Sequence, residues 1–116
     1  MTNKEVSAEI LPLTEAFFYI LLSLSQTPSH GYGIMQDVER MSGKRVRIGA
    51  GTLYTALGAL RKKGLIQSAA APDGSDPRRK MYAITQSGQH ALQAEANRLQ
   101  DMVKTAQKIL QGARKA

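Results

Sequence analysis

The chain has 116 residues and a formal net charge of +7, and this length favours a single domain. It contains no cysteine, which excludes thiol catalysis, disulfide frameworks and zinc sites with cysteine ligands. Aromatic residues make up only 5% of the sequence. The core must therefore consist mainly of aliphatic side chains, a composition that favours helices over a β-sandwich.

The charge is unevenly distributed along the chain. Residues 1–39 contain one basic and five acidic residues, whereas residues 40–80 contain ten basic and two acidic residues. A basic middle section is typical of a protein that binds a polyanion such as nucleic acid. Basic residues that serve only solubility are the alternative interpretation.

The first predicted helix begins near Pro12 and Thr14 and ends at about Ser25. Its apolar residues recur at helical spacing; they are Leu13, Phe17, Ile20, Leu21 and Leu24. The apolar run at residues 16–22 is much shorter than the roughly 20 residues of a membrane span. Acidic residues precede this run, where a signal peptide would be basic. We therefore expect a cytoplasmic protein that does not enter a membrane.

The following segment predicts a turn, a second helix and a short strand. Residues 27–31 have turn chemistry, and Ser29 is the expected N-cap of a helix that ends at residues 42–43. One face of this helix carries Ile34, Met35, Val38 and Met41. Residues 44–48 alternate basic and β-branched side chains, a pattern typical of a half-buried strand.

The third predicted helix, residues 50–63, separates apolar side chains from small and polar ones. Its apolar face consists of Leu53, Ala56, Leu57 and Leu60. Its opposite face and flanks carry the candidate DNA contacts Thr52, Tyr54, Thr55 and Lys62. A small polar face suits the major groove of DNA. The alternative is an ordinary surface helix, whose basic residues 61–63 complement the helix dipole, followed by Gly64 as a left-handed cap.

A β-hairpin is predicted after this helix. Residues 65–68 and 78–84 form the two expected strands, and residues 72–77 form a turn-rich connection. The returning strand begins with three cations, Arg78, Arg79 and Lys80. A long loop with a basic base is suited to a phosphate backbone or a minor groove. An edge strand that charge protects from aggregation is the alternative.

Three helices, a small strand and a basic hairpin, in that order, predict a winged helix-turn-helix. Several short sequences also occur in a specific order and spacing: HGYGI at residues 30–34, GTLY at 51–54, GLI at 64–66, RKMYAIT at 79–85, and Gly88. With these sequences, residues 13–92 resemble the PadR family of bacterial transcriptional regulators. The resemblance implies that the first motif begins the second helix and that the second motif opens a recognition helix. Ala50, Gly58 and Arg61 depart from the usual family pattern.

The last segment predicts a long helix that begins at about Gln86, with Thr85 as its cap. Apolar residues recur along it at intervals of seven with companions three and four positions further on. A helix of about 27 residues is about 40 Å long, which exceeds a small winged domain. We expect the first turns, around Leu92, to pack on their own domain and the rest to contact a second copy. The candidate dimerisation residues are Leu92, Leu99, Met102, Val103, Ala106, Ile109 and Leu110.

An enzymatic function is not expected. Residues 49–51 resemble the beginning of a dinucleotide-binding motif, but Tyr54 occupies the place of its third glycine and no Walker-type sequence occurs. His30 and His90 are far apart in sequence, and no pair of carboxylates at helical spacing points to acid–base catalysis. We therefore expect no metal and no cofactor.

Together, these patterns predict a mainly α fold with a small β-wing. Residues 10–85 form a winged helix-turn-helix domain and residues 86–116 a C-terminal dimerisation helix. The expected function is that of a homodimeric regulator, acting as a repressor on double-stranded DNA. The resemblance implies relief by a small apolar or aromatic effector, for which the candidate pocket residues are Phe17, Phe18, Leu99 and Met102. A winged-helix module that contacts RNA or protein is the alternative.

Overall fold

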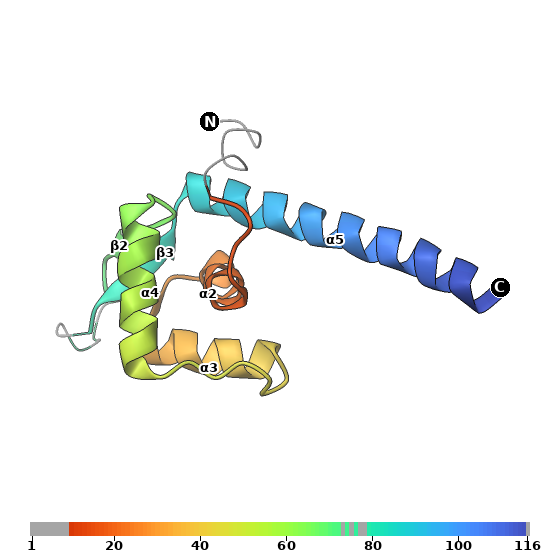
Figure 1. Cartoon of the computed structure of the whole chain (residues 1–116). Helices are drawn as coiled ribbons and strands as arrows, with labels where there is room; N and C mark the ends of the chain where they lie inside the picture. Colours follow the sequence, from red (N-terminus) through yellow and green to blue (C-terminus); the bar gives the residue numbers. More distant parts are fainter. Residues whose placement is uncertain (1–9, 73, 75, 77–78, 116) are drawn as a thin grey trace.

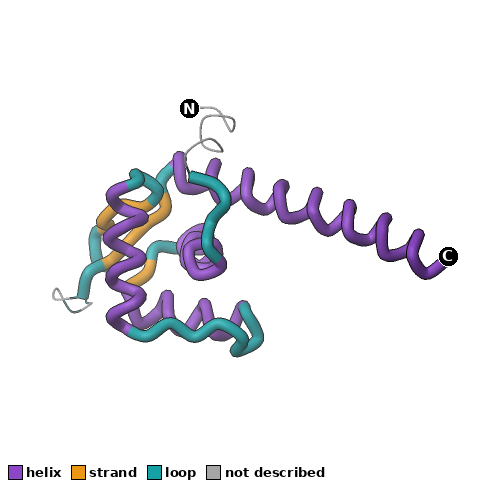
Figure 2. The backbone as a smooth tube through the Cα atoms, in the orientation of Figure 1, coloured by secondary structure: helices purple, strands orange, loops and turns teal. Residues whose placement is uncertain are grey.

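The computed structural model describes residues 10–72, 74, 76 and 79–115. The elements follow in the order α2 (Glu15–Gln26), β1 (Ser29–His30), α3 (Gly31–Met41), α4 (Ala50–Lys62), β2 (Ile66–Ala69), β3 (Met81–Ile84) and α5 (Gln86–Lys115). Figures 1 and 2 show a head of helices and a small sheet, from which α5 projects. The mainly α fold with a small β-wing is thus confirmed. Within the described residues, no helix is both long and apolar enough to cross a membrane.

Helix α2 lies at the centre of the head, where it contacts α3, α4 and the beginning of α5. It begins at the predicted place because the Thr14 hydroxyl accepts a hydrogen bond from the Phe17 amide at 3.1 Å. Its side chains Ile20 and Leu21 are fully buried. Fully buried side chains from the neighbouring elements pack in the same core: Ile34, Val38, Leu53, Leu60 and Leu65.

The sheet has three antiparallel strands in the order β1-β3-β2. Strand β1 pairs with β3, with Ser29 opposite Tyr82. The sequence analysis did not predict this strand. The prediction of a strand at residues 44–48 was wrong. Gly43 and Lys44 both have positive φ angles, 62° and 67°, and the Ser42 hydroxyl accepts from the Val46 amide at 2.9 Å. These residues therefore form a compact turn, while β1 occupies the edge of β3 opposite β2.

The N-cap of α3 is His30, and the prediction of Ser29 was wrong by one residue. The imidazole Nδ1 of His30 accepts a hydrogen bond from the Gly33 amide at 3.1 Å. Ser29 lies in β1 instead, and its hydroxyl approaches Gly33 so closely that a Cβ there would lie 2.4 Å from it. Strand pairing with β3 therefore takes precedence over the capping preference of serine.

The end of α4 is tied to the beginning of α5. Gly64 has a φ of 76°, as its predicted role as a left-handed cap requires, and the Leu65 amide donates to the Leu60 carbonyl at 3.0 Å. The Thr85 hydroxyl donates to the Gly64 carbonyl at 2.7 Å and accepts from the Gly88 amide at 3.0 Å. Thr85 thus caps α5, as predicted, and fixes its direction relative to α4.

Helix α5 has 30 residues, which corresponds to a length of about 45 Å. Its first turns pack on the head, where Ala91, Leu92 and Glu95 are buried. Leu92 therefore belongs to the core of its own chain, as we expected for the first turns. Further along, the helix leaves the head (Figure 1), and a series of apolar side chains is exposed: Leu99, Met102, Val103, Ala106, Ile109 and Leu110.

Candidate nucleic-acid interface

The two faces of α4 differ as the sequence predicts. The side chains of Leu53, Leu57 and Leu60 are almost completely buried. Thr52, Thr55, Gly58 and Lys62 are exposed. The helix therefore presents small and polar groups to solvent while its apolar face holds it against α2 and α3.

Thr55 has a defined hydrogen-bonding state on this face. Its hydroxyl donates to the Gly51 carbonyl, one turn earlier, at 3.0 Å. Because the hydroxyl hydrogen is used within the helix, Thr55 offers lone pairs and a methyl group to the outside. Those groups match the amino groups of adenine and cytosine and the methyl group of thymine in a major groove.

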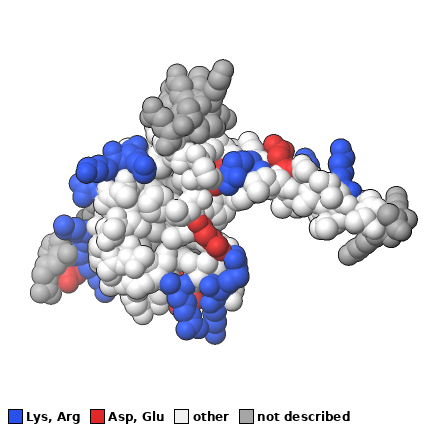
Figure 3. All heavy atoms as spheres, viewed as in Figure 1, with Lys and Arg blue, Asp and Glu red and all other residues white. Residues whose placement is uncertain are grey.

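Basic side chains gather over the C-terminal end of α4 and near the turn that follows α3 (Figure 3). The first group consists of Arg61, Lys62 and Lys63, which are all exposed. In the second group, Arg45 is paired with Glu15 at 2.6 Å and Arg47 with Glu39 at 3.5 Å. Among the described residues, no carboxylate forms an ion pair with the cations of the first group, so their charge is available to a polyanion.

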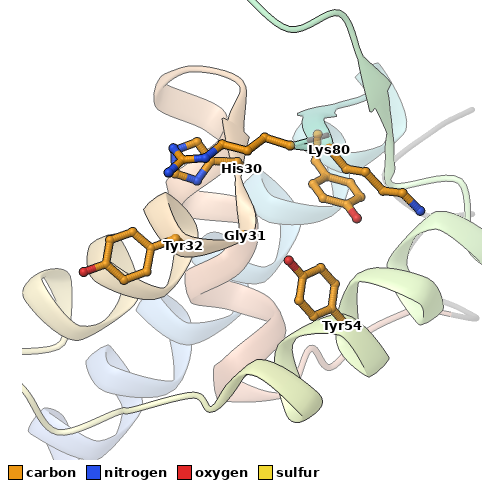
Figure 4. A pocket seen from close by; sticks show the side chains of 7 residues that line it. His30, Gly31, Tyr32, Tyr54 and Lys80 are labelled. Atoms are coloured by element: carbon orange, nitrogen blue, oxygen red, sulfur yellow. The ribbon is translucent and has the colours of Figure 1, made fainter. Parts of the chain in front are cut away.

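A pocket of about 430 Å³ opens where the beginnings of α3 and α4 meet β3 (Figure 4). Among the described residues, its lining consists of His30, Gly31, Tyr32, Tyr54, Arg79, Lys80 and Tyr82. None of these residues is acidic. The pocket therefore combines basic and aromatic side chains from the helix-turn-helix and from the base of the wing.

Tyr54 reaches from α4 across to the first residue of α3 (Figure 4). A Cβ atom at Gly31 would lie 2.8 Å from the Tyr54 hydroxyl oxygen, so the glycine makes room for this side chain. Tyr54 is nevertheless 54% exposed, and the neighbouring Tyr32 is 60% exposed. Both side chains are therefore accessible to a ligand at the surface of the pocket.

Tyr82 forms the floor of the pocket and is buried. Burial raises the pKa of its hydroxyl, the nearby Tyr54 raises it further, and Arg61 acts in the opposite direction. The Tyr82 hydroxyl therefore remains protonated and neutral. An anion at this pocket meets no negative charge from the floor.

His30 and Arg79 meet at the edge of the pocket. Their atoms Nε2 and Nη1 lie 3.2 Å apart. The Arg79 backbone is held by a hydrogen bond from its amide to the Asp76 carbonyl at 3.0 Å. The base of the wing is thus placed directly beside the N-terminus of α3, whose dipole also favours an anion.

The structure brings some of the predicted DNA contacts together and leaves others apart. Tyr54, Arg79 and Lys80 surround the pocket, whereas Thr52, Thr55 and Lys62 lie along α4 outside its lining. Arg78 lies outside the described residues. Sequence reasoning missed His30, Tyr32 and Tyr82. The HGYGI motif contained the first two, but only the pairing of β1 with β3 shows that His30 lies beside the wing.

The residues predicted for an effector pocket lie on two separate elements, α2 and α5. Phe17 and Phe18 are half-buried and pack against the core of the head. Leu99 and Met102 are exposed on α5, at 36% and 55%. A cavity between these pairs in a dimer stays a prediction.

The arrangement of α3, α4 and the wing defines a winged helix-turn-helix protein, a class that binds DNA through the helix corresponding to α4. The family model described as the transcriptional regulator PadR-like family matches residues 20–94. The chain belongs to this family. The family is one of transcriptional regulators, so the match confirms the resemblance stated from the sequence and supports the expected functional class.

Solved structures of similar proteins support this assignment. A transcriptional regulator from Clostridium thermocellum is 27% identical, with a TM-score of 0.68 over 80% of this chain and 87% of that one. A PadR-like transcription factor from Bacteroides fragilis is 25% identical, with a TM-score of 0.66 over 80% and 87%. A PadR family regulator from Clostridium difficile shares the fold, with 24% identity and a TM-score of 0.70 over 84% and 99%.

One curated relative is an uncharacterized 37.1 kDa protein in the transposon TN4556 of Streptomyces fradiae. It is 34% identical over 83 residues, which cover 72% of this chain. The match spans only 22% of the length of that relative. The two proteins therefore share one region.

Proposed function

We propose that this chain is a homodimeric, operator-specific repressor that acts in the cytoplasm on double-stranded DNA. In this proposal, α4 enters the major groove and reads bases, while the base of the wing contacts the phosphate backbone. Residues 10–85 form the DNA-binding domain, and residues 86–116 carry the dimer contacts. Binding over a promoter would block transcription of the adjacent gene.

The observation that carries this proposal is the surface of α4 together with the base of the wing. Thr52, Thr55 and Lys62 are exposed on the helix, and Arg79 and Lys80 are exposed beside it. The helix supplies small groups that fit a groove, and the wing supplies cations that fit the backbone. Both lie on the same head, so one docking arrangement can engage both.

The exposed half of α5 supports dimerisation. Met102, Val103, Ile109 and Leu110 are each more than half exposed in the single chain. An apolar stripe along a helix that extends beyond its own core is the pattern of a helix that packs against a partner. A second copy of the chain offers the same stripe, so a two-fold arrangement covers both at once.

A small apolar or aromatic effector completes the proposal. In a two-fold dimer, the α5 helices would meet near the two heads. Leu99 and Met102 would then lie near the half-buried Phe17 and Phe18. Methionine adapts to ligands of different shape. An effector that binds this space in the DNA-free arrangement would release the operator.

A gel-shift titration tests the proposal. The probe is the DNA upstream of the coding region of the chain itself, and unlabelled random DNA and RNA serve as competitors. We expect a discrete complex that resists both competitors and contains two chains per duplex. Equal competition by RNA would support the RNA-binding alternative and contradict operator recognition.

A further inference from the structure

The imidazole of His30 faces two hydrogen-bond donors. The Gly33 amide approaches Nδ1 at 3.1 Å, and the Arg79 guanidinium approaches Nε2 at 3.2 Å. A neutral imidazole has one nitrogen that accepts and one that donates. A guanidinium has no acceptor atom at all. One of the two contacts is therefore a contact between donors.

The contact between the Gly33 amide and His30 Nδ1 is a proper hydrogen bond. The Gly33 amide is one of the N-terminal amides of α3 that have no partner within the helix, and His30 is the N-cap that accepts from it. The lone pair of His30 is thus on Nδ1, and the ring hydrogen is on Nε2. At the edge of the pocket, Nε2 of His30 and Nη1 of Arg79 are then both hydrogen-bond donors and lie 3.2 Å apart.

Two donors at this distance fit one anionic oxygen that accepts from both. No acidic residue lines the pocket among the described residues, and Lys80 adds a further positive charge. Tyr32 and Tyr54, which also line the pocket, add no negative charge to it. The local chemistry therefore favours a single charged oxygen ligand, as in a phosphate group.

We propose that His30 and Arg79 together bind one phosphate of the DNA backbone. This inference rests on DNA binding by the winged domain and adds His30 to its contacts. His30 would act twice: Nδ1 holds the beginning of α3, and Nε2 donates to the phosphate. Because a phosphate is the same in every sequence, this pair fixes the position of the head on the duplex without reading bases.

Two substitutions separate the roles of His30. Serine is a favoured N-cap, so His30→Ser keeps an acceptor for the Gly33 amide and removes only the second donor. Arg79→Gln removes the cation. We expect His30→Ser to leave the melting temperature unchanged and to weaken binding to operator and random duplexes by about tenfold each, as for a lost hydrogen bond to a charged group.

The salt dependence distinguishes the two residues. The logarithm of the binding constant falls as the logarithm of the salt concentration rises. Arg79→Gln should make this slope shallower by about one unit, because a cation is lost. His30→Ser should leave the slope unchanged, because the imidazole donates without carrying a charge. The double variant should lose less affinity than the product of the two single losses, since both donors serve one phosphate.

A duplex in which single phosphates are replaced by neutral methylphosphonates identifies the ligand. One position should weaken binding of the wild-type chain and have a much smaller effect on both His30→Ser and Arg79→Gln. His90→Gln on α5 serves as the histidine control and should behave as wild type. This pattern assigns the ligand to the DNA, as opposed to a free anion.

Three results would overturn the inference. The first is that His30→Ser binds DNA with unchanged affinity. The second is that the double variant loses as much affinity as the product of the two single losses. The third is that the methylphosphonate position whose effect is reduced differs between His30→Ser and Arg79→Gln. If the wild-type chain itself binds no duplex, the proposed function fails together with this inference. Binding by the wild type alongside any of the three results removes only the His30 contact.

Discussion

Glu95 is the most deeply buried charged side chain among the described residues, with 1% of its surface exposed. One carboxylate oxygen accepts from the Leu13 amide at 2.7 Å, and Arg98 donates to both oxygens. These bonds connect α5 to the segment that precedes α2. The side-chain hydrogen bond from Arg98 lowers the pKa of Glu95 most strongly, the Leu13 amide lowers it further, and burial raises it.

This lowered pKa predicts a loss of stability in acid. The folded chain binds a proton at Glu95 less readily than the unfolded chain, so the stabilisation is complete above the ordinary pKa of 4.5. It is lost as the pH falls from that value through the lower pKa of the folded chain. At pH 7, Glu95→Gln should reduce the free energy of unfolding by about 1–3 kcal/mol in urea titrations.

The pH dependence of the same variant provides the check. The difference in stability between the wild-type chain and Glu95→Gln should shrink as the pH falls below 4.5. The control is Glu15→Gln, which removes a carboxylate whose ion pair with Arg45 is exposed and should cost less. A difference for Glu95→Gln that stays constant down to acid pH would contradict the assignment of this stability to the ionised carboxylate.

Gly88 is required by a close approach between elements. A Cβ at this position would lie 2.1 Å from the Leu65 carbonyl oxygen. Gly88→Ala should therefore push the beginning of α5 away from the end of α4 and cost about 1–3 kcal/mol in thermal or urea unfolding. Gly112→Ala on the same helix is the matched control. Nothing lies near its Cβ, so it should stabilise the helix slightly. Equal effects at the two positions would show that helix propensity alone matters.

At the scale of elements, α4 and the wing have different expected roles. The double substitution Arg79→Ala with Lys80→Ala removes two exposed cations from the wing. It should weaken binding to operator and random DNA alike and reduce the salt slope by about one unit per lost phosphate contact. Fluorescence anisotropy at several salt concentrations measures both quantities.

Substitutions on α4 should instead change specificity. Thr55→Ala and Lys62→Ala remove exposed groups from the outward face and should reduce the preference for operator over random DNA by about 1–3 kcal/mol for a direct base contact. The control is Lys104→Gln on α5, which removes a positive charge without changing α4. If the wing variants altered sequence preference while the α4 variants did not, the two roles would be reversed.

The elements that could be predicted from the sequence are those with strong local signals. The apolar period of α4, the Gly64 cap and the Thr85 cap each depend on neighbouring residues and are found where expected. Strand β1 could not be predicted, because two residues carry no period and gain their order only from pairing with β3. For the same reason the pocket was missed: His30 and Arg79 are 49 positions apart and meet only through that pairing.

At the scale of the whole molecule, α5 determines how two heads would be placed on DNA. The chain measures 62 Å along its longest axis, and the fixed junction of α4 with α5 sets the angle between head and helix. A two-fold dimer must place two copies of α4 about 34 Å apart to enter successive major grooves. The dimer contacts on α5 and the rigidity at Thr85 therefore both affect DNA binding.

The exposed apolar stripe on α5 predicts that a charged substitution within it weakens the dimer. Ile109 is 66% exposed in the single chain, and Ile109→Lys would place a charge in the proposed seam of each copy. We expect at least a tenfold weaker dimer, about 1.4 kcal/mol, measured by light scattering and sedimentation over a range of concentrations. Gln111→Lys is the matched control, because it adds the same charge on the opposite face of the helix. A wild-type chain that stays monomeric at micromolar concentration would contradict the dimer.

The effector prediction also depends on this seam. The chain contains no tryptophan, so Leu99→Trp would introduce both a stacking surface and a single fluorescent reporter at the proposed pocket. Planar aromatic cations should quench this fluorescence, raise the melting temperature of the variant more than that of the wild-type chain, and release operator DNA. Release must accompany stabilisation, because a ligand regulates only through its different affinity for the two states. Phenolic acids provide a comparison of opposite charge. Stabilisation without release of DNA, or the absence of quenching, would exclude the seam between α5 and the heads as the site of regulation.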